Sequence, residues 1–181
     1  MKKLIIAIVA LFTFGAFSAS AQKIGHLNYI QVMDSIDTYQ LANKKGEDVQ
    51  KEFEETMKYL QEDYQKKATD YQNGMDTLVP ILRELKEQEL YQIQQLSEAK
   101  QQEYQRSLQV IQERYYTPLE DWLKQAVAIV GKAKGLDYVL YYDEQSSVFW
   151  VNPDKGVDIT MAVIAEMKKL EKANPILTPG G

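Results

Sequence analysis

The side chains that most often carry out chemistry in proteins are scarce in this chain. Its 181 residues include one histidine, His26, and no cysteine. Thiol catalysis, zinc sites of the Cys/His type and multi-histidine metal centres are therefore excluded. No serine or acidic residue accompanies His26 in a recognisable pattern of nucleophilic catalysis, and its neighbours are typical of a β-strand. We expect a structural role for this histidine.

Acidic pairs are the next candidates, because two carboxylates held together can act as general acid and base. Examples are Glu54-Glu55 and Glu62-Asp63. Adjacent residues of a helix point in different directions, and lysines follow at helical spacing, as Lys58 follows Glu54. A solvated helix surface explains these pairs. The glycines of Gly131–Gly135 lack the spacing of a phosphate-binding loop. We predict a protein that is not an enzyme and uses no cofactor and no metal.

Tyrosine is the unusual feature, with 12 copies in the chain. Several tyrosines fall in the central half rather than near the ends, together with methionines and the apolar run Leu78–Leu82. Two interpretations remain open. These residues can pack along the seam between two helices, or some of them can form adaptable apolar patches that contact a partner.

The elements that position these residues begin after an export signal. Lys2 and Lys3 precede an apolar run from Leu4 to Phe17, and an Ala-x-Ala site predicts cleavage after Ala21. The alternative is a retained anchor, but about 14 apolar residues rise only some 21 Å as a helix, short of a bilayer core of about 30 Å. We predict a soluble periplasmic chain without a stable membrane anchor. Losing both lysines lowers the net charge from -5 to -7, which argues against nucleic acid.

The central half of the chain predicts a helical hairpin. From Tyr39 to about Asn73, apolar residues recur at steps of three and four, in a repeat of eleven that indicates a nearly straight helix pair. Asn73-Gly74 and Pro80 then favour a reversal of the chain. A second helix of similar length follows, from about Ile81 to Tyr116. Each arm is expected to be on the order of 50 Å long.

Shorter elements flank this hairpin. Lys23–Asn28 is predicted to be a strand, and Pro118 to kink or restart the second helix, which ends at Gly135. The β-branched and aromatic segments 137–142 and 148–152 predict a β-hairpin. A last helix is expected over Ile159–Leu170.

The fold class that follows is mainly α with a small β body and a long antiparallel helical hairpin. The domains are a signal peptide at 1–21, a body formed by 22–38 and 117–172, an arm at 39–116 with its tip at about 73–81, and a disordered tail at 173–181. One chain has few and short strands, which give it only a small hydrophobic core. We therefore predict an oligomer whose subunits combine their strands.

The sequence resembles the Skp/OmpH-like family of periplasmic chaperones. The resemblance lies in the strand Lys23–Asn28 after a signal peptide, the Gln/Glu/Lys-rich hairpin, and an end block that includes Leu123–Val127, Gly135–Leu140 and Val157–Thr160. It implies a homotrimer whose arms enclose a cavity and hold unfolded outer-membrane β-barrel proteins without ATP.

Two sets of residues are predicted to serve that function. The residues expected to contact the client are Met57, Tyr64, Tyr71, Met75, Leu78, Val79 and Leu82. The residues expected to assemble the trimer body are Ile24, Leu27, Val139, Tyr141, Val148 and Trp150. The rival interpretation is an exported coiled-coil structural or scaffold protein that binds a folded partner.

The arm departs from the family in its charge. Residues 38–117 carry 11 Lys and Arg against 15 Asp and Glu, whereas well-known members of the family are basic. Basic arms suit those members to lipopolysaccharide, and we therefore do not infer lipopolysaccharide binding for this chain. Client capture is expected to depend on apolar and aromatic contacts.

Overall fold

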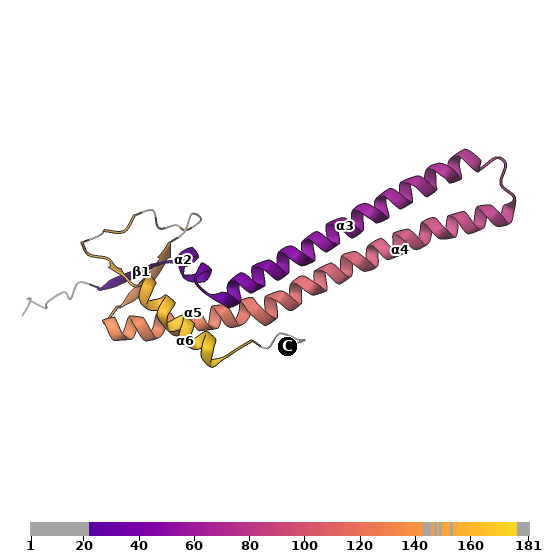
Figure 1. Cartoon of the computed structure of the whole chain (residues 1–181). Coiled ribbons are helices and arrows are strands. Elements are labelled where there is room, and N and C mark those ends of the chain that lie inside the picture. The colour runs from indigo at the N-terminus through magenta and orange to yellow at the C-terminus, as the bar shows by residue number, and fades with distance from the viewer. Residues whose placement is uncertain (1–21, 143–145, 147, 149, 153, 177–181) are drawn as a thin grey trace, which may run out of the picture.

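The computed structural model of the protein describes residues 22–142, 146, 148, 150–152 and 154–176. They form a long helical hairpin and a small body of helices and short strands (Figure 1). The predicted fold class, mainly helical with a small sheet and a projecting hairpin, is confirmed. The signal peptide expected at 1–21 and the last five residues of the expected tail, 177–181, lie outside the described residues.

The arm consists of α3 (Asp37–Gly74) and α4 (Pro80–Ile111). With 38 residues, α3 is about 57 Å long at about 1.5 Å per residue. Its apolar stripe faces α4, and Leu60 and Ile93 are only 4% and 9% exposed at the middle of the seam. Other stripe residues stay half-buried, because a pair of helices has solvent on both flanks. Among the tyrosines, Tyr64, Tyr71 and Tyr104 are half-buried along this seam, whereas Tyr59 and Tyr91 are exposed, so seam packing is observed for only some of them.

The chain reverses between the two helices of the arm. The backbone N–H groups of Thr77 and Leu78 donate to the Gly74 carbonyl oxygen at 2.9 and 3.0 Å, which closes the last turn of α3. Val79 is extended, and Pro80 is the first residue of α4. Proline suits that position because its missing N–H would have no partner in the first turn of a helix.

At its base, α4 continues through the π-helical turn η1 (Gln112–Tyr116) into α5 (Thr117–Lys134). Pro118 lies in the first turn of α5, so the predicted restart occurs without a sharp break. Helix α5 ends at Gly135, whose φ of 61° lies in the left-handed region that glycine adopts at little cost. The N–H of Leu136 then donates to the Gly131 carbonyl at 2.9 Å.

The sheet has three parallel strands, in which β1 (Ile24–Asn28) lies between β2 (Tyr138–Tyr142) and β3 (Val157–Asp158). Strands from both ends of the described chain therefore meet in one sheet, as predicted. Parallel neighbours need a long crossover between them. The whole arm and α5 form the crossover between β1 and β2.

The predicted β-hairpin is wrong. Residues 148 and 150–152 form no strand, and β2 pairs with β1 instead. The chain after β2 passes from one edge of the sheet to the other, where Gly156 donates its N–H to the Asn152 carbonyl at 2.8 Å and β3 begins. Aromatic and β-branched residues favour a strand, but the strand forms only where a neighbouring strand can pair with it. Here the position beside β1 is taken by β3.

The core of the body lies on one face of this sheet, under α2 (Tyr29–Asp34), α5 and α6 (Thr160–Ala173). Helix α2 directly follows β1, and the side chain of Asn28 caps it by accepting a hydrogen bond from the Gln31 N–H at 3.0 Å. The fully enclosed core residues include Leu27, Val32, Met33, Ile36, Leu119, Ile159, Val163 and Met167.

Several contacts fix the arm to the body. Glu171 of α6 accepts a hydrogen bond from the backbone N–H of Thr38 at 2.7 Å, at the first turn of α3. The Tyr116 hydroxyl donates to the Asn43 side chain at 2.6 Å, and burial raises the pKa of Tyr116. A second buried cluster of Ala42, Ile111 and Tyr115 lies beside this bond.

Candidate functional site

The seven residues predicted to contact a client fall into two groups in the structure. Met57 and Tyr64 line a groove near the middle of the arm, whereas Met75, Val79 and Leu82 are exposed at its tip. Leu78 is half-buried, with its side chain over Gly74. Tyr71 lies between them on α3, where its hydroxyl donates to Glu87 of α4. That hydrogen bond raises the pKa of Tyr71.

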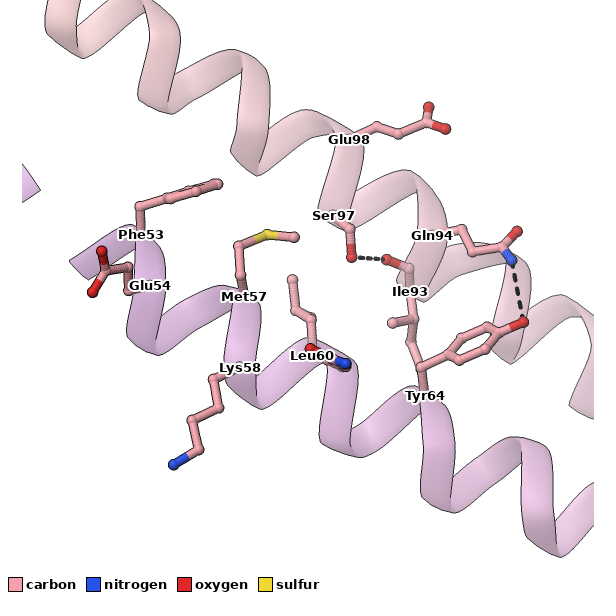
Figure 2. Close-up of a pocket in the computed structure, with 11 residues that line it drawn as sticks. Phe53, Glu54, Met57, Lys58, Leu60, Tyr64, Ile93, Gln94, Ser97 and Glu98 are labelled. Carbon is pink, nitrogen blue, oxygen red and sulfur yellow. Dashed lines mark hydrogen bonds between the residues drawn. The ribbon is translucent and has the colours of Figure 1, made fainter. Parts of the chain in front are cut away.

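The groove, which we call the mid-arm groove, has a volume of about 890 Å³. Its lining comprises Phe53, Glu54, Met57, Lys58, Leu60, Gln61 and Tyr64 of α3 with Ile93, Gln94, Ser97 and Glu98 of α4. Figure 2 shows the apolar side chains of both helices pointing into the space between them. Most of the apolar surface comes from α3. The hollow exists because α4 places the small side chain of Ser97 opposite Met57 and Phe53.

Polar contacts hold the residues that border this groove. Ser97 donates its hydroxyl to the Ile93 carbonyl of its own helix at 2.9 Å, so it does not reach across the hollow. The Gln94 amide donates to the Tyr64 hydroxyl at 3.2 Å and joins the two helices (Figure 2). The aromatic ring of Tyr64 is therefore fixed as one wall.

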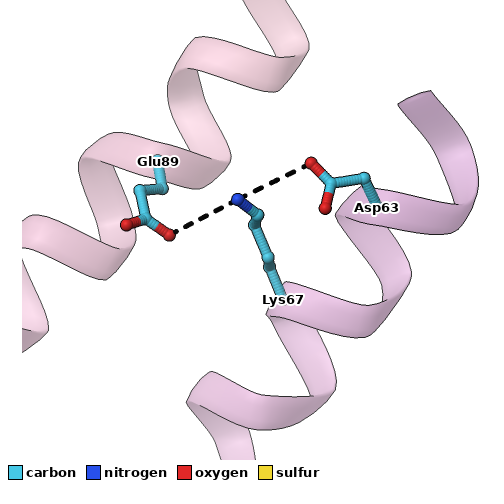
Figure 3. Close-up of polar contacts among 3 residues, drawn as sticks. All are labelled: Asp63, Lys67 and Glu89. Atoms are coloured by element: carbon cyan, nitrogen blue, oxygen red, sulfur yellow. Dashed lines mark ion pairs between the residues drawn. The ribbon is translucent and has the colours of Figure 1, made fainter. Parts of the chain in front are cut away.

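The two ends of the groove are closed by different contacts. Toward the body, the rings of Phe53 and Tyr104 stack with their centroids 4.3 Å apart. Toward the tip, Lys67 lies between Asp63 of its own helix and Glu89 of α4, at 3.6 Å from each carboxylate (Figure 3). Exposed ion pairs of this kind contribute only about 0 to 1 kcal/mol each. The stacked rings of Phe53 and Tyr104 are therefore the stronger of the two contacts between α3 and α4.

The opposite flank of the arm has a second groove nearer the body, which we call the basal groove. Its volume is about 460 Å³. It is lined by Lys45, Asp48, Val49, Glu103, Arg106, Ser107, Val110, Ile111, Arg114 and Tyr115. Half of these residues carry a charge. Both grooves have apolar walls with charged residues among the lining, and three of the residues that line the mid-arm groove carry a charge, namely Glu54, Lys58 and Glu98.

The tip of the arm is the third apolar surface. Its exposed residues are Met75, Val79, Ile81, Leu82 and Leu85. Ile81 and Leu85 extend the set predicted from the sequence, and their spacing of four places them on one face of α4. The helical periodicity of α4 could have identified both residues.

The residues predicted to assemble a trimer do not all lie on one surface. Ile24 and Tyr141 are exposed, Trp150 is 72% exposed, and Val139 and Val148 are half-buried. The structure corrects the position predicted for Leu27, because this side chain is only 2% exposed and lies in the core of a single chain. Alternate residues of a strand face opposite sides, so the open face is that of Ile24, with Tyr138 and Leu140 beside it on β2.

The polar side chains of the sheet, those of His26 and Asp158, contact neighbouring residues of the body. The ring of His26 lies 5.8 Å from that of Tyr142, and its Nδ1 atom is buried with no hydrogen-bond partner among the described residues. Burial alone would raise the pKa of Asp158, but hydrogen bonds from Thr160 outweigh it and lower that pKa. Across the described part of the chain, no cluster of three or more His, Cys, Asp and Glu side chains could hold a metal ion.

This arrangement defines a class of protein in which a small body carries a long helical arm with exposed grooves. Comparison with known proteins then identifies the family. The family model described as Outer membrane protein (OmpH-like) matches residues 23–167, which include the whole arm and nearly all of the body. The chain therefore belongs to the OmpH-like family.

A solved structure has the same fold. It is that of a candidate outer membrane chaperone (OmpH-like) from Caulobacter crescentus, which is 15% identical in sequence. The match covers 91% of this chain and 92% of the other, with a TM-score of 0.61. Comparison with curated proteins gave no match. Among the residues that the structure describes, none of the helices combines the length and apolar content needed to cross a membrane.

Proposed function

We propose that this protein is an ATP-independent periplasmic holdase that keeps unfolded outer-membrane β-barrel proteins from aggregating. The observation that carries the proposal is the distribution of apolar surface along the arm. The mid-arm groove and the exposed tip residues Met75, Val79 and Leu82 all lie far from the core of the body. Exposed apolar surface of this kind is typical of a site that binds apolar partners. Membership of the OmpH-like family supports the same function.

The charge of the arm sets the kind of contact. Acidic residues outnumber basic ones over residues 38–117, and the ion pairs of the arm are exposed. Long-range attraction to an anionic client is therefore weak, and apolar contacts dominate client capture. Each contact contributes little affinity, but several arms acting together raise the total. A client held in this way can leave without an energy source.

The proposal includes a homotrimer formed through the body. The open face of the sheet exposes Ile24, Tyr138 and Leu140, and Tyr141 is exposed on the other face of β2. The outer edge of β2 has no neighbouring strand among the described residues. An exposed apolar sheet face and an open strand edge both favour association with further copies of the chain.

The trimer is tested by charge substitution on that face. Leu140→Asp should convert a trimer into monomers in sedimentation equilibrium, because the new carboxylate would be desolvated in the interface. Tyr59→Asp on the arm is the matched control, since Tyr59 is also exposed and lies far from the sheet. A wild-type chain that sediments as a monomer, or a Leu140→Asp variant that remains a trimer, would contradict the assembly.

The holdase is tested by light scattering without ATP. A urea-unfolded outer-membrane barrel is diluted into buffer with and without the mature chain. We expect scattering to be suppressed, and a folded barrel to remain unbound. The rival function, an exported coiled-coil scaffold, predicts the reverse: unchanged scattering and saturable binding of a folded protein.

A further inference from the structure

The arm is linked to the body at two places. Helix α3 follows Ile36, whose backbone is extended with φ of -106° and ψ of 123°, and α4 continues into α5 through the π-helical turn η1. A π-helical turn interrupts the regular hydrogen bonding of an α-helix, so η1 is a place where the helix can bend. Because α3 is about 57 Å long, a rotation of about 10° at these links would move the tip of the arm by about 10 Å. The contacts around the links therefore set where the tip lies.

Two buried clusters meet beside these links. One is the core of the body, and the other, which we call the arm-base cluster, consists of Ala42, Ile111 and Tyr115. The half-buried side chains of Tyr116 and Ile176 pack against both clusters. Tyr116 belongs to η1, which is itself one of the links. Ile176 comes from the segment after α6, so it connects the arm to the body as a third, non-covalent attachment.

The end of α6 directs this segment, Asn174–Ile176, toward the arm. The backbone N–H and the side-chain amide of Asn174 both donate to the Leu170 carbonyl oxygen, at 3.0 and 2.9 Å, and close the last turn of the helix. Pro175 cannot continue a helix and restricts the backbone of the residue before it. The chain therefore leaves α6 in a defined direction, toward the base of the arm, where Ile176 packs (Figure 1).

A polar contact from the same end of α6 lies close to this packing. Glu171 accepts a hydrogen bond from the backbone N–H of Thr38 at 2.7 Å, in the first turn of α3. Ile176 packs against the cluster that contains Ala42, which is one helical turn further along α3. One contact would leave the arm free to rotate about that point, whereas contacts on successive turns oppose rotation. The hydrogen bond and the apolar packing therefore restrain the arm together.

We propose that Asn174–Ile176 is a strap that fixes the angle of the arm on the body, with Ile176 as the side chain that holds it in place. When Ile176 leaves the arm-base cluster, the arm rotates at Ile36 and η1, while the core of the body and the seam between α3 and α4 stay folded. The strap acts whether or not the arm binds a client, so it is independent of the proposed holdase function.

The first test measures the angle of the arm. Because the chain has no cysteine, Glu62→Cys on α3 and Lys168→Cys on α6 accept two nitroxide labels at exposed positions. Double electron–electron resonance is recorded with an excess of unlabelled chain, so that each distance lies within one chain. Ile176→Ser should broaden the distance distribution by several ångströms, since a rotation of about 10° displaces residue 62 by about 6 to 7 Å. The matched control, Ile129→Ser, removes the same side chain from α5, where it is exposed, and should leave the distribution unchanged.

A second measurement establishes that the rest of the chain stays folded. Hydrogen exchange followed by mass spectrometry reports the body, the seam and the base of the arm separately. In Ile176→Ser, protection should fall only in η1 and the first turns of α3, while β1, α6 and residues 55–100 exchange as in the parent chain. Ile176→Leu keeps an aliphatic side chain of the same size and should restore both the narrow distance distribution and the protection.

The possible results decide whether the strap exists. Broadening in Ile176→Ser alone, reversed in Ile176→Leu and without loss of protection in the body, supports it. A distribution as narrow in Ile176→Ser as in the parent chain would overturn it. Equal broadening in Ile129→Ser, or lower protection throughout the body of Ile176→Ser, would also overturn it, because the side chain would then stabilise the fold in general and not the angle of the arm.

Discussion

Replacing Leu60 with alanine should loosen the arm and leave the body intact. Leu60 is 4% exposed and lies where α3 meets α4, but one side of it lines the open mid-arm groove. The truncation removes three carbon atoms and enlarges a space that water already reaches. The cost is therefore the transfer term alone, roughly 2 to 2.5 kcal/mol, without the additional penalty of a closed cavity.

The comparison variant is Leu119→Ala, which removes the same atoms from a side chain that is 0% exposed in the body core. There a closed cavity remains, and the expected cost is about 3 to 5 kcal/mol. Hydrogen exchange followed by mass spectrometry reports the two regions separately. Leu60→Ala should lower protection over residues 50–100 while the strands and α6 exchange normally, whereas Leu119→Ala should lower protection in the body. Unchanged exchange in the arm of Leu60→Ala would refute the packing of the seam.

Three further predictions concern the body and its joint with the arm. Glu171→Ala should lower the free energy of unfolding by about 1 kcal/mol, because the backbone N–H of Thr38 loses its acceptor, while Glu171→Gln should retain most of it in urea titration. Asp158 has a lowered pKa in the folded protein. Its contribution to the free energy of unfolding is therefore present above the unfolded pKa of about 4 and is lost as the pH falls through the folded pKa. Asp158→Asn should reduce the acid dependence of unfolding below about pH 4, and an unchanged dependence would contradict the role of the Thr160 bonds. Gly135→Ala should lower the free energy of unfolding by about 1 kcal/mol, because the φ of residue 135 is 61° and alanine adopts that conformation only with strain. Thermal unfolding measures this change, and a smaller decrease would mean that the left-handed turn is not needed.

Client capture should respond weakly to salt. Raising the ionic strength from about 50 to 500 mM screens exposed charges but not apolar contacts. Binding of the unfolded barrel, measured by fluorescence anisotropy, should change less than about threefold, as an arm with excess acidic residues implies. A steep loss of affinity would mean that charges on the arm dominate capture.

The long helices could be predicted from the sequence because their signals are local. The stripe from Val49 to Tyr71 has helical spacing over six turns, and Gly74 and Pro80 bracket the reversal. The order of the strands could not be predicted in this way. Residues 148–152 have strand-forming types, but whether they form a strand depends on which edge of β1 is open, and β3 with only two residues is too short to leave a pattern.

The positions of the candidate residues could be predicted only in part, and their contact with a client stays a prediction. Met57 and Tyr64 were identified by type and position, and both line the mid-arm groove. The position of Ser97 in the lining of this groove could not be predicted, because it depends on where the opposite helix lies. Leu27 was assigned to a subunit interface, since alternation along a strand separates two faces without showing which one the helices of the same chain cover.

Native mass spectrometry of the chain from Gln22 onward tests the proposed holdase function most directly. Spectra are recorded for the chain alone and after dilution of a urea-unfolded outer-membrane barrel into it. The proposed function predicts three chains alone, and three chains with one barrel after mixing. A monomer or dimer that leaves the unfolded barrel unbound would contradict it.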